Sequence, residues 1–261
     1  MPTPPVGPQA DHLLACELAE ASGALLLGVR AELGFDDATA LREAGDRRSH
    51  ELLMRRLAEA RPDDAVLSEE GVDDAGRLSA SRVWILDPLD GTREFGEPGR
   101  VDWAVHVALW VAGELVAGAV ALPAQGRTYS TARAEPTPAA TSRPMRIVVS
   151  RTRPPEFLQR VAEARGGELV PLGSAGAKVA AVIAGDADAY IHAGGQYEWD
   201  SAAPVAAARA AGLHASRIDG GDLLYNRPDP LLPDLVVCRA ADAAGLVEAI
   251  AHAQLAALKA S

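Results

Sequence analysis

The sequence predicts a mixed α/β fold in which the two halves of the chain are built differently. Two stretches near the start, residues 11–33 and 49–60, carry leucine and alanine at helical spacing, and several short apolar runs follow them. After a segment rich in proline, alanine and threonine, strand and helix patterns alternate to the end of the chain. We therefore expect an α+β first half and an α/β second half.

The first half is predicted to form an N-terminal α+β lobe over residues 11–133, preceded by a disordered lead-in over residues 1–10. Its two helices end near Gly34 and before the Arg61-Pro62 pair, because glycine and proline commonly close helices. Five apolar runs are typical of strands in a largely antiparallel sheet, namely residues 65–68, 83–86, 101–111, 115–122 and 128–130.

The second half is predicted to form a C-terminal α/β lobe over residues 145–261, joined to the first by a linker over residues 134–144. Apolar runs and helical spacings alternate here, as strand–helix units require. The predicted strands cover residues 146–149, 168–171, 187–192 and 235–238. The predicted helices cover residues 155–165, 174–184, 200–211 and 241–258.

The charge of the chain argues against some classes of partner. The formal net charge is −11, so no basic excess exists to neutralise duplex nucleic acid or an anionic membrane. A small anionic substrate remains open, because a few bound cations can reverse the local sign. The contents of 48% hydrophobic and 23% charged residues are ordinary for a soluble globular protein.

One apolar stretch, residues 103–122, is long enough to suggest a membrane span. His106 and Glu114 interrupt it, and Ala112-Gly113 in its middle is typical of a turn. Because glutamate is costly in the middle of a bilayer, two buried antiparallel strands explain the stretch better.

The two cysteines, Cys16 and Cys238, form neither a metal-binding spacing nor a disulfide framework. The start of the chain, MPTPPVGPQ, has no basic stretch and no apolar run, so we expect no signal peptide. Both observations favour a cytoplasmic protein with inert, buried cysteines.

The stretch WILDPLDGTREF places two acids, Asp87 and Asp90, directly after an apolar strand. Pro88 stiffens the expected tight turn between them, so the two carboxylates can converge on one point. Another predicted strand ends in a pair of glutamates that begins at Glu69, and Asp200 lies at a helix start, where the dipole tolerates an anion. We expect these segments to meet in one pocket.

Four carboxylates in one pocket would repel each other unless cations were bound. Each close pair costs about 1–4 kcal/mol at effective dielectric constants between those of water and a protein surface. That is large against a total stability of about 5–15 kcal/mol. Oxygen ligands without a histidine pair favour Mg²⁺ over zinc. An isolated D-x-x-D segment after a strand is, however, also typical of turn and cap chemistry.

Three segments taken together are more specific. LSEE, WILDPLDGTREF and EWDSAA resemble the signatures of the inositol monophosphatase superfamily, the lithium-sensitive, Mg²⁺-dependent phosphomonoesterases. The resemblance covers nearly the whole chain. It implies a layered αβαβα sandwich with the site between the lobes, a homodimer, and direct attack of a metal-activated water on a phosphate monoester.

The resemblance also implies roles for individual residues. Glu69 and the carbonyl oxygen of Leu89 would bind the first metal ion, and Asp87 would bridge two ions. Asp90 and Asp200 would bind the second ion. Two Mg²⁺ ions are therefore implied, with a third if a further acid takes part.

The phosphate and the attacking water have implied partners as well. Gly91 and Thr92 would offer backbone N–H groups to the phosphate at a helix start, and the Thr92 hydroxyl would orient the water. The family's other water-orienting acid lies in a T-x-x-D motif ahead of the second helix. Its best match here is Glu43-Ala-Gly-Asp46, in which Glu43 stands where threonine is usual and the lysine common upstream is missing. Asp46 is thus the implied partner of Thr92, or a ligand of the third metal ion.

Within the superfamily, the chain is most similar to the CysQ-type phosphatases of 3′-phosphoadenosine 5′-phosphate (PAP). The similar segments are REF after DGT, then VVSRTR, GSAGAK and EWDSAAP. A bisphosphate carries a second anionic group that the metal ions do not reach, and a lysine or helix N–H groups can hold it. The implied substrate contacts are Ser150, Arg151, Gly173, Ser174, Lys178 and, toward a sugar hydroxyl, Glu198.

Plainer roles stay open for three of these residues. Arg151 could belong to a solvated loop, Lys178 could cover a helix face, and Ser174 could be only a helix cap. The sequence pattern alone does not choose between these roles and substrate binding.

The leading interpretation is a 3′(2′),5′-bisphosphate nucleotidase that acts on PAP, and on its sulfated parent PAPS, in sulfate assimilation. One alternative is an inositol-1-phosphate or fructose-1,6-bisphosphate phosphatase, or an enzyme that accepts several of these substrates. Another alternative is a non-catalytic metal- or nucleotide-binding protein, which the incomplete T-x-x-D motif would favour.

Overall fold

The computed structural model describes residues 8–139 and 142–258. Its α-helices are α1 (Pro8–Leu33), α2 (Ala38–Ala60), α3 (Thr92–Phe95), α4 (Leu158–Ala164), α5 (Ala175–Ile183), α6 (Glu198–Ala210) and α7 (Ala243–Leu258). Short 3-10 turns cover Ala75–Ser79, Pro123–Gln125, Thr131–Arg133 and Ala240–Asp242.

The strands form two five-stranded sheets. The first sheet has the order β1 (Ala65–Ser68), β2 (Arg82–Asp90), β3 (Ala104–Val111), β4 (Glu114–Leu122), β5 (Arg127–Ser130). The second sheet has the order β7 (Gly167–Leu172), β6 (Met145–Ser150), β8 (Ala189–Ala193), β10 (Asp234–Arg239), β9 (Leu213–Ser216).

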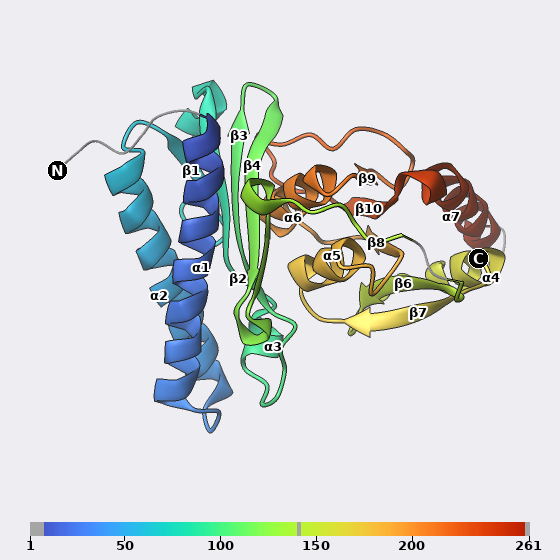
Figure 1. Ribbon diagram of the computed structural model, residues 1–261, viewed down its shortest axis with the longest axis horizontal. Helices are drawn as coiled ribbons and strands as arrows, with labels where there is room; N and C mark the ends of the chain where they lie inside the picture. The colour runs from blue at the N-terminus through green and yellow to red at the C-terminus, as the bar shows by residue number, and fades with distance from the viewer. Residues whose placement is uncertain (1–7, 140–141, 259–261) are drawn as a thin grey trace.

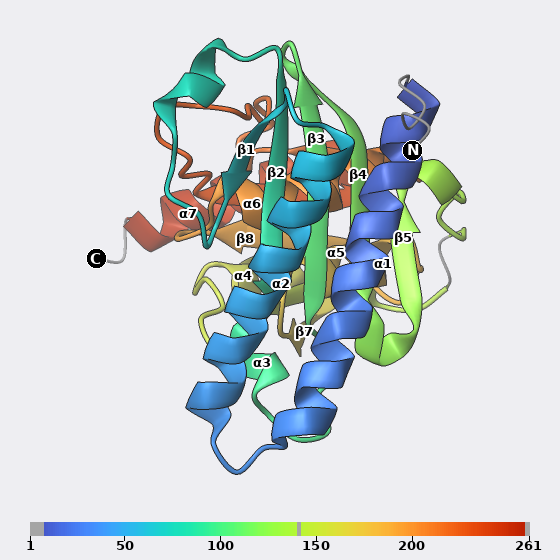
Figure 2. The ribbon, with the colours of Figure 1, turned by 90° about the vertical axis from the view of Figure 1, so that its left-hand side faces the viewer.

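The helices and sheets stack in five layers (Figure 1). α1 and α2 lie side by side across the outer face of the first sheet, as Figure 2 shows. α5 and α6 fill the space between the two sheets, and α4 and α7 cover the far face of the second sheet. This is the αβαβα sandwich that the family resemblance implied, so that prediction is confirmed.

The pairing of the strands agrees with the predicted change between the two halves. In the first sheet β1 runs parallel to β2, and the other neighbours are antiparallel. In the second sheet β6 runs parallel to β7 and to β8, and β10 is antiparallel to both its neighbours. The apolar stretch at residues 103–122 forms β3 and β4, joined at Ala112-Gly113, so the interpretation as two antiparallel strands is confirmed.

Three apolar clusters hold the layers together. One lies between α1, α2 and the first sheet, and one lies between the second sheet, α4 and α7. The third joins the inner faces of both sheets to α5 and α6. Because this central cluster draws on both halves of the chain, the halves share one core. The division into lobes at residues 134–144 stays a prediction.

Some element boundaries were predicted wrongly. The second helix begins at Ala38 and not at residue 49, because the Asp37 side chain accepts hydrogen bonds from the N–H groups of Thr39 and Ala40 and so caps a polar first half. β9 was missed, because its four residues carry little apolar periodicity. Of the predicted lead-in, residues 1–7 lie outside the described part of the chain, and residues 8–10 belong to α1.

The segment Asp87–Asp90 is a bulged strand end and not a separate tight turn. β2 continues through both acids to Asp90, and the register against β3 shifts between Asp87 and Asp90. A bulge of this kind redirects side chains locally. It therefore redirects the side chains of two acids that remain buried at the end of the strand.

α1 is long and apolar enough, by length and composition alone, to cross a membrane. Of its most apolar window, 44% is buried inside the fold. Ala15, Leu18 and Leu26 on this buried side join the cluster against the first sheet. Their burial shows α1 as a helix of the packed fold.

Candidate active site

Three acids that are far apart in the chain meet at the seam between the first sheet and α6. Oxygen atoms of Asp87, Asp90 and Asp200 all lie within 4.8 Å of one another. Asp87 and Asp90 come from the bulged end of β2, and Asp200 comes from the first turn of α6. The structure thus brings together the acids of the second and third sequence signatures.

Local structure orients Asp200 toward this cluster. Its Oδ2 accepts a hydrogen bond from the backbone N–H of Tyr197, at 2.7 Å, which closes a capping box at the start of α6. The free N–H groups and the dipole of a helix start favour a negative charge there. One oxygen of Asp200 is therefore tied to the cap while its carboxylate faces the other acids.

Glu69 and Asp46 approach the same cluster from two other elements. Glu69 follows β1, and its carboxyl group shares a hydrogen bond with that of Asp87. Asp46 lies within α2, where the Thr92 hydroxyl is 3.4 Å from its Oδ1. The prediction placed Asp46 ahead of this helix, and the early start of α2 corrects that placement.

Burial and mutual repulsion disturb the pKa values of these acids. Burial first, and then neighbouring negative charges, raise the pKa of Asp46, Glu69 and Asp200 to about 7. The same two causes hold the pKa of Asp87 well above its ordinary value. These carboxyl groups resist being ionised at the same time. A bound divalent cation would stabilise their ionised form.

Asp90 is the exception. Burial by itself would raise its pKa, but His106, Lys178 and Ser174 outweigh burial and hold the pKa below its ordinary value. The Ser174 hydroxyl and the Gly176 N–H donate hydrogen bonds to Asp90 Oδ2, at 2.5 and 2.7 Å. In return, the Asp90 carboxylate raises the pKa of His106 against the effect of burial.

The donor set fits Mg²⁺. It consists of carboxylate oxygens, and Mg²⁺ prefers oxygen ligands. The Leu89 carbonyl, predicted as a further ligand, accepts a hydrogen bond from the Thr92 hydroxyl at 3.0 Å. The Leu89 N–H donates to Asp87 Oδ1 at 3.0 Å. These contacts tie Leu89 to the side chains of Asp87 and Thr92.

A glycine makes the next turn of the chain possible. Gly91 has φ +84° and precedes α3. A Cβ there would lie 3.1 Å from the Ser174 Cβ and 3.3 Å from the Asp102 carbonyl oxygen. The backbone therefore turns in a left-handed conformation, against close neighbours, to start α3 beside the acids.

A cavity of about 240 Å³ lies next to the cluster. Asp90 and Asp200 line it together with residues from both halves of the chain. It includes these predicted phosphate and substrate contacts: Gly91, Thr92, Ser150, Arg151, Gly173, Ser174 and Lys178.

The two basic candidates already have protein partners. Arg151 is 2.7 Å from a Glu94 oxygen and 2.9 Å from a Glu97 oxygen. Lys178 is buried, and its Nζ donates to the carbonyl oxygens of Gly173 and Ser174, at 3.1 and 2.6 Å. Lys178 therefore holds the Gly173-Ser174 segment in place, and this structural role is independent of any contact to a ligand.

Ser174 combines the role of a cap with a contact to an acid. Its hydroxyl accepts the N–H of Ala177 at 3.0 Å, as an N-cap does, while donating to Asp90. Its φ is +49°, which is uncommon for a residue with a side chain. Strain of this kind is found mainly at functional sites, where the surrounding contacts hold it.

Glu198 does not join the other candidates. Its Oε2 accepts the Asn226 N–H at 2.6 Å, and its Oε1 accepts the Arg227 N–H at 2.8 Å. It is buried and is not among the residues that line the cavity. Two positions along a helix correspond to a rotation of about 200°, so Glu198 and Asp200 face different ways.

His106 and Asp102 were not predicted as residues of the site. His106 contacts Asp90, and Asp102 accepts the Gly173 N–H at 2.6 Å. His106 interrupts the apolar 103–122 stretch, and Asp102 directly precedes it. For His106, a polar residue inside an apolar run was the available signal.

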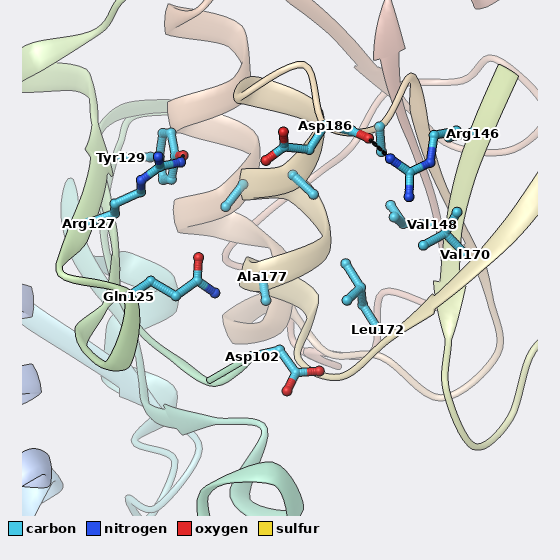
Figure 3. Close-up of a pocket in the computed structure, with 13 residues that line it drawn as sticks. Asp102, Gln125, Arg127, Tyr129, Arg146, Val148, Val170, Leu172, Ala177 and Asp186 are labelled. Atoms are coloured by element: carbon cyan, nitrogen blue, oxygen red, sulfur yellow. Dashed lines mark hydrogen bonds between the residues drawn. The ribbon is translucent and has the colours of Figure 1, made fainter. Parts of the chain in front are cut away.

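A second cavity, of about 260 Å³, lies along another face of α5 (Figure 3). Arg127 and Tyr129 come from the first sheet, and Arg146 comes from the second, where its guanidinium donates to the Asp186 carbonyl at 2.9 Å. Figure 3 shows Asp102 at its lower end. It contains none of the acids of the cluster, so we do not assign it to catalysis.

Comparison with known proteins supports the family resemblance inferred from the three sequence segments. The profile of the Inositol monophosphatase family matches residues 12–256. A 3′-phosphoadenosine 5′-phosphate phosphatase of Mycobacterium tuberculosis (strain CDC 1551 / Oshkosh) is 55% identical over 240 residues, 89% of this chain and 90% of that protein. The 3′(2′),5′-bisphosphate nucleotidase CysQ of Escherichia coli (strain K12) is 32% identical over 206 residues, 72% of this chain and 81% of that protein.

Solved structures of the same fold are also similar. Mycobacterium tuberculosis SuhB superposes with a TM-score of 0.73 at 28% identity and covers 95% of this chain and 98% of its own. CysQ from Bacteroides thetaiotaomicron superposes with a TM-score of 0.75 at 28% identity, over 88% of this chain and 97% of its own. The shared fold, the profile match and the identity to these relatives agree, and the chain belongs to the inositol monophosphatase family.

Proposed function

We propose that this protein is a Mg²⁺-dependent phosphomonoesterase that removes the 3′-phosphate of PAP, as a 3′(2′),5′-bisphosphate nucleotidase. The observation that carries the proposal is the cluster of Asp87, Asp90 and Asp200, of which Asp90 and Asp200 line a cavity beside it. The 55% identity to a PAP phosphatase over 89% of the chain supports the choice of substrate.

In the proposed site, Glu69, Asp87 and the Leu89 carbonyl would hold one Mg²⁺, and Asp87, Asp90 and Asp200 would hold a second. When bound, Mg²⁺ lowers the pKa of a coordinated water and neutralises charge on the phosphate oxygens. The raised pKa values of Glu69, Asp87 and Asp200 support this assignment, because a cation relieves the repulsion that causes part of each shift.

Thr92 and Asp46 orient the attacking water in this proposal. The Thr92 hydroxyl donates to the Leu89 carbonyl at 3.0 Å and is 3.4 Å from Asp46. The pKa of Asp46, at about 7, suits a group that takes a proton from water near neutral pH. Asp46 as the ligand of a third Mg²⁺ is the alternative role.

The rest of the cavity is proposed to bind the nucleotide. Gly91 and Thr92 offer N–H groups to the phosphate that is cleaved, while Ser150, Arg151 and Lys178 lie on the side that would face the second phosphate. Lys178 contributes positive charge to this side from a buried position. Gly173 and Ser174 complete the lining.

A substrate panel at one Mg²⁺ concentration tests the proposal. We expect kcat/KM for PAP to exceed the values for inositol-1-phosphate and fructose-1,6-bisphosphate by about 10-fold or more, because neither competitor carries the adenosine and inositol-1-phosphate also lacks a second phosphate, so groups of the site would stay unpaired. Omission of Mg²⁺ should abolish phosphate release. Binding of PAP without phosphate release would contradict the proposal and favour a non-catalytic binding protein.

Inositol-1-phosphate hydrolysis is the second candidate, because the profile that matches residues 12–256 is that of the Inositol monophosphatase family. The acids would be the same, so Arg151 is the residue that separates the two candidates. Arg151→Gln should raise KM for PAP about 10-fold, through loss of a charge-assisted contact, and leave KM for inositol-1-phosphate unchanged. Arg160→Gln, on the exposed side of α4, is the matched control. An equal loss for both substrates would speak against Arg151 as a nucleotide contact.

Four further properties belong to the same proposal. Inhibition by lithium, assembly as a homodimer and a role in sulfate assimilation follow from the family resemblance, and a cytoplasmic location follows from the cysteine pattern and the start of the sequence. The burial of Cys16 and Cys238, whose pKa values are raised by that burial, supports inert thiols.

A further inference from the structure

His106 lies between the two proposed metal-ligand segments. It is a fully buried residue of β3, directly opposite Asp87 in the strand register. Its Nε2 is 3.1 Å from Asp90 Oδ2, and its Nδ1 is 3.1 Å from the Trp199 carbonyl oxygen. A carbonyl oxygen only accepts, so Nδ1 carries the proton in that contact.

These two contacts join different parts of the molecule. Asp90 ends β2 in the first half of the chain, while Trp199 immediately precedes Asp200 in the first turn of α6. The imidazole ring therefore spans the distance between the two acids proposed to bind the same metal ion. The ring contacts the Asp90 carboxylate directly, and it is hydrogen-bonded to the backbone carbonyl of Trp199, the residue before Asp200.

The neighbouring helix leaves room for this ring. A Cβ on Gly176 of α5 would lie 2.2 Å from His106 Nε2. The Gly176 N–H donates to the same Asp90 oxygen that His106 contacts. Asp90 Oδ2 thus receives contacts from His106, Ser174 and Gly176.

We propose that His106 is a positioning residue, which fixes the orientation of Asp90 and its distance from Asp200 and thereby sets the affinity of the second Mg²⁺ site. The inference rests on the proposed function only in naming the cation. His106 does not itself line the cavity, and the side chains it contacts there are the proposed metal ligands Asp90, at 3.1 Å, and Asp87, at 3.9 Å. Its effect therefore falls on metal binding before it falls on catalysis.

The test is a calorimetric Mg²⁺ titration of the protein without substrate, at one pH. His106→Phe keeps the ring volume and removes both nitrogen contacts, and we expect it to weaken Mg²⁺ binding about 10–100-fold, the usual cost of losing a partner that orients a metal ligand. His106→Asn retains one N–H donor and should recover part of that affinity. His214→Asn, in β9 and hydrogen-bonded to Ser216, is the matched control and should bind Mg²⁺ as the wild type does.

Activity gives a second readout. At saturating Mg²⁺, KM for PAP should stay within about 2-fold of wild type in both His106 variants. The Mg²⁺ concentration that gives half of the maximal rate should rise by the same factor as the loss of Mg²⁺ affinity measured by calorimetry. Wild-type Mg²⁺ affinity in both variants would overturn the proposal, as would a KM increase without loss of Mg²⁺ affinity. Should His106→Phe fail to fold, His106→Asn decides by the same criterion. If the wild type binds Mg²⁺ without hydrolysing PAP, the proposed function fails and the Mg²⁺ affinities still decide the role of His106.

Discussion

Asp87 and Asp90 are three positions apart on one strand, yet their pKa values shift in opposite directions. Asp87 faces other carboxyl groups, which add to the effect of burial. Asp90 faces His106, Lys178 and the Ser174 hydroxyl, which together outweigh burial. At the scale of single residues, the neighbours brought by the fold decide which acid is ionised without a metal ion.

Asp46 offers the clearest test at this scale. Asp46→Asn should lower kcat about 10²–10⁴-fold, the usual contribution of a proton-accepting group, because it removes the charged partner of Thr92. Steady-state kinetics at saturating Mg²⁺ measure the loss. Glu43→Gln, on the exposed face of the same helix, is the matched control and should keep kcat within about 2-fold. A kcat for Asp46→Asn close to that of wild type would rule out this role and with it the match to the T-x-x-D motif.

Much of the candidate site could be predicted at the residue scale, and part could not. Asp87 and Asp90 lie at the end of a strand and Asp200 lies at the start of a helix, and such positions place side chains where they can meet. His106 was not predicted, because one histidine inside an apolar run has no spacing that indicates its partner. The contact that defines its role, to the Trp199 carbonyl, spans 93 residues of sequence.

At the scale of elements, the bulged end of β2 and the start of α5 position Asp90 together. The bulge turns Asp90 toward the central layer, and the first turn of α5 meets it with a hydroxyl and an N–H group. The sequence pattern predicts β2 and α5 themselves. It does not predict the bulge or the positive φ of Ser174, because both depend on contacts between these two elements.

Gly176→Ala tests this pairing. The new Cβ would lie 2.2 Å from His106 Nε2 and 2.9 Å from Val120 Cγ1, so the helix or the ring must move. We expect a loss of about 1–3 kcal/mol in the free energy of unfolding, as for other overpacked cores, together with weaker Mg²⁺ binding. Urea denaturation and calorimetry measure the two effects.

Gly28→Ala is the control for helix propensity. Gly28 lies within α1, where a Cβ would meet nothing within 4 Å. This substitution should stabilise the protein by about 0.5–1 kcal/mol, because alanine loses less backbone entropy in a helix. Equal effects of the two substitutions would mean that crowding at His106 is not what determines the response to Gly176→Ala.

At the scale of the whole molecule, the layer order explains why the site lies where it does. Glu69, Asp87 and Asp90 come from the ends of two neighbouring strands of the first sheet, and Asp200 comes from the start of α6 and lies close to Asp87 and Asp90. In Figure 1, α6 lies in the central layer next to this sheet. The alternation of strands and helices predicts these layers, since each apolar face needs a partner. The central cluster, shared by both halves, then holds the acids together against their repulsion.

This balance predicts how pH acts on the stability of the metal-free protein. The pKa values of Asp46, Glu69 and Asp200, at about 7, lie above the values of about 4 expected in the unfolded chain. Between pH about 4 and pH about 7 the folded state binds more protons than the unfolded state. The contribution of these three carboxyl groups to the free energy of unfolding therefore falls as pH rises through this range. Mg²⁺ competes with those protons and relieves the repulsion, so the Mg²⁺-induced increase in Tm should be small at pH 5 and larger at pH 8.

Thermal unfolding at pH 5, 6, 7 and 8, with MgCl₂ or with KCl at the same ionic strength, measures this difference apart from general screening. A gain of about 1 kcal/mol corresponds to roughly 2–4 °C for a chain of this size, so a shift of several degrees at pH 8 is expected. Asp200→Asn removes one of the repelling charges. It should therefore raise the Tm of the metal-free protein at pH 8 and reduce its response to Mg²⁺. A Mg²⁺ response that is the same at pH 5 and pH 8 would mean that protons and the cation do not compete for these carboxylates, and the buried acids would then need another explanation.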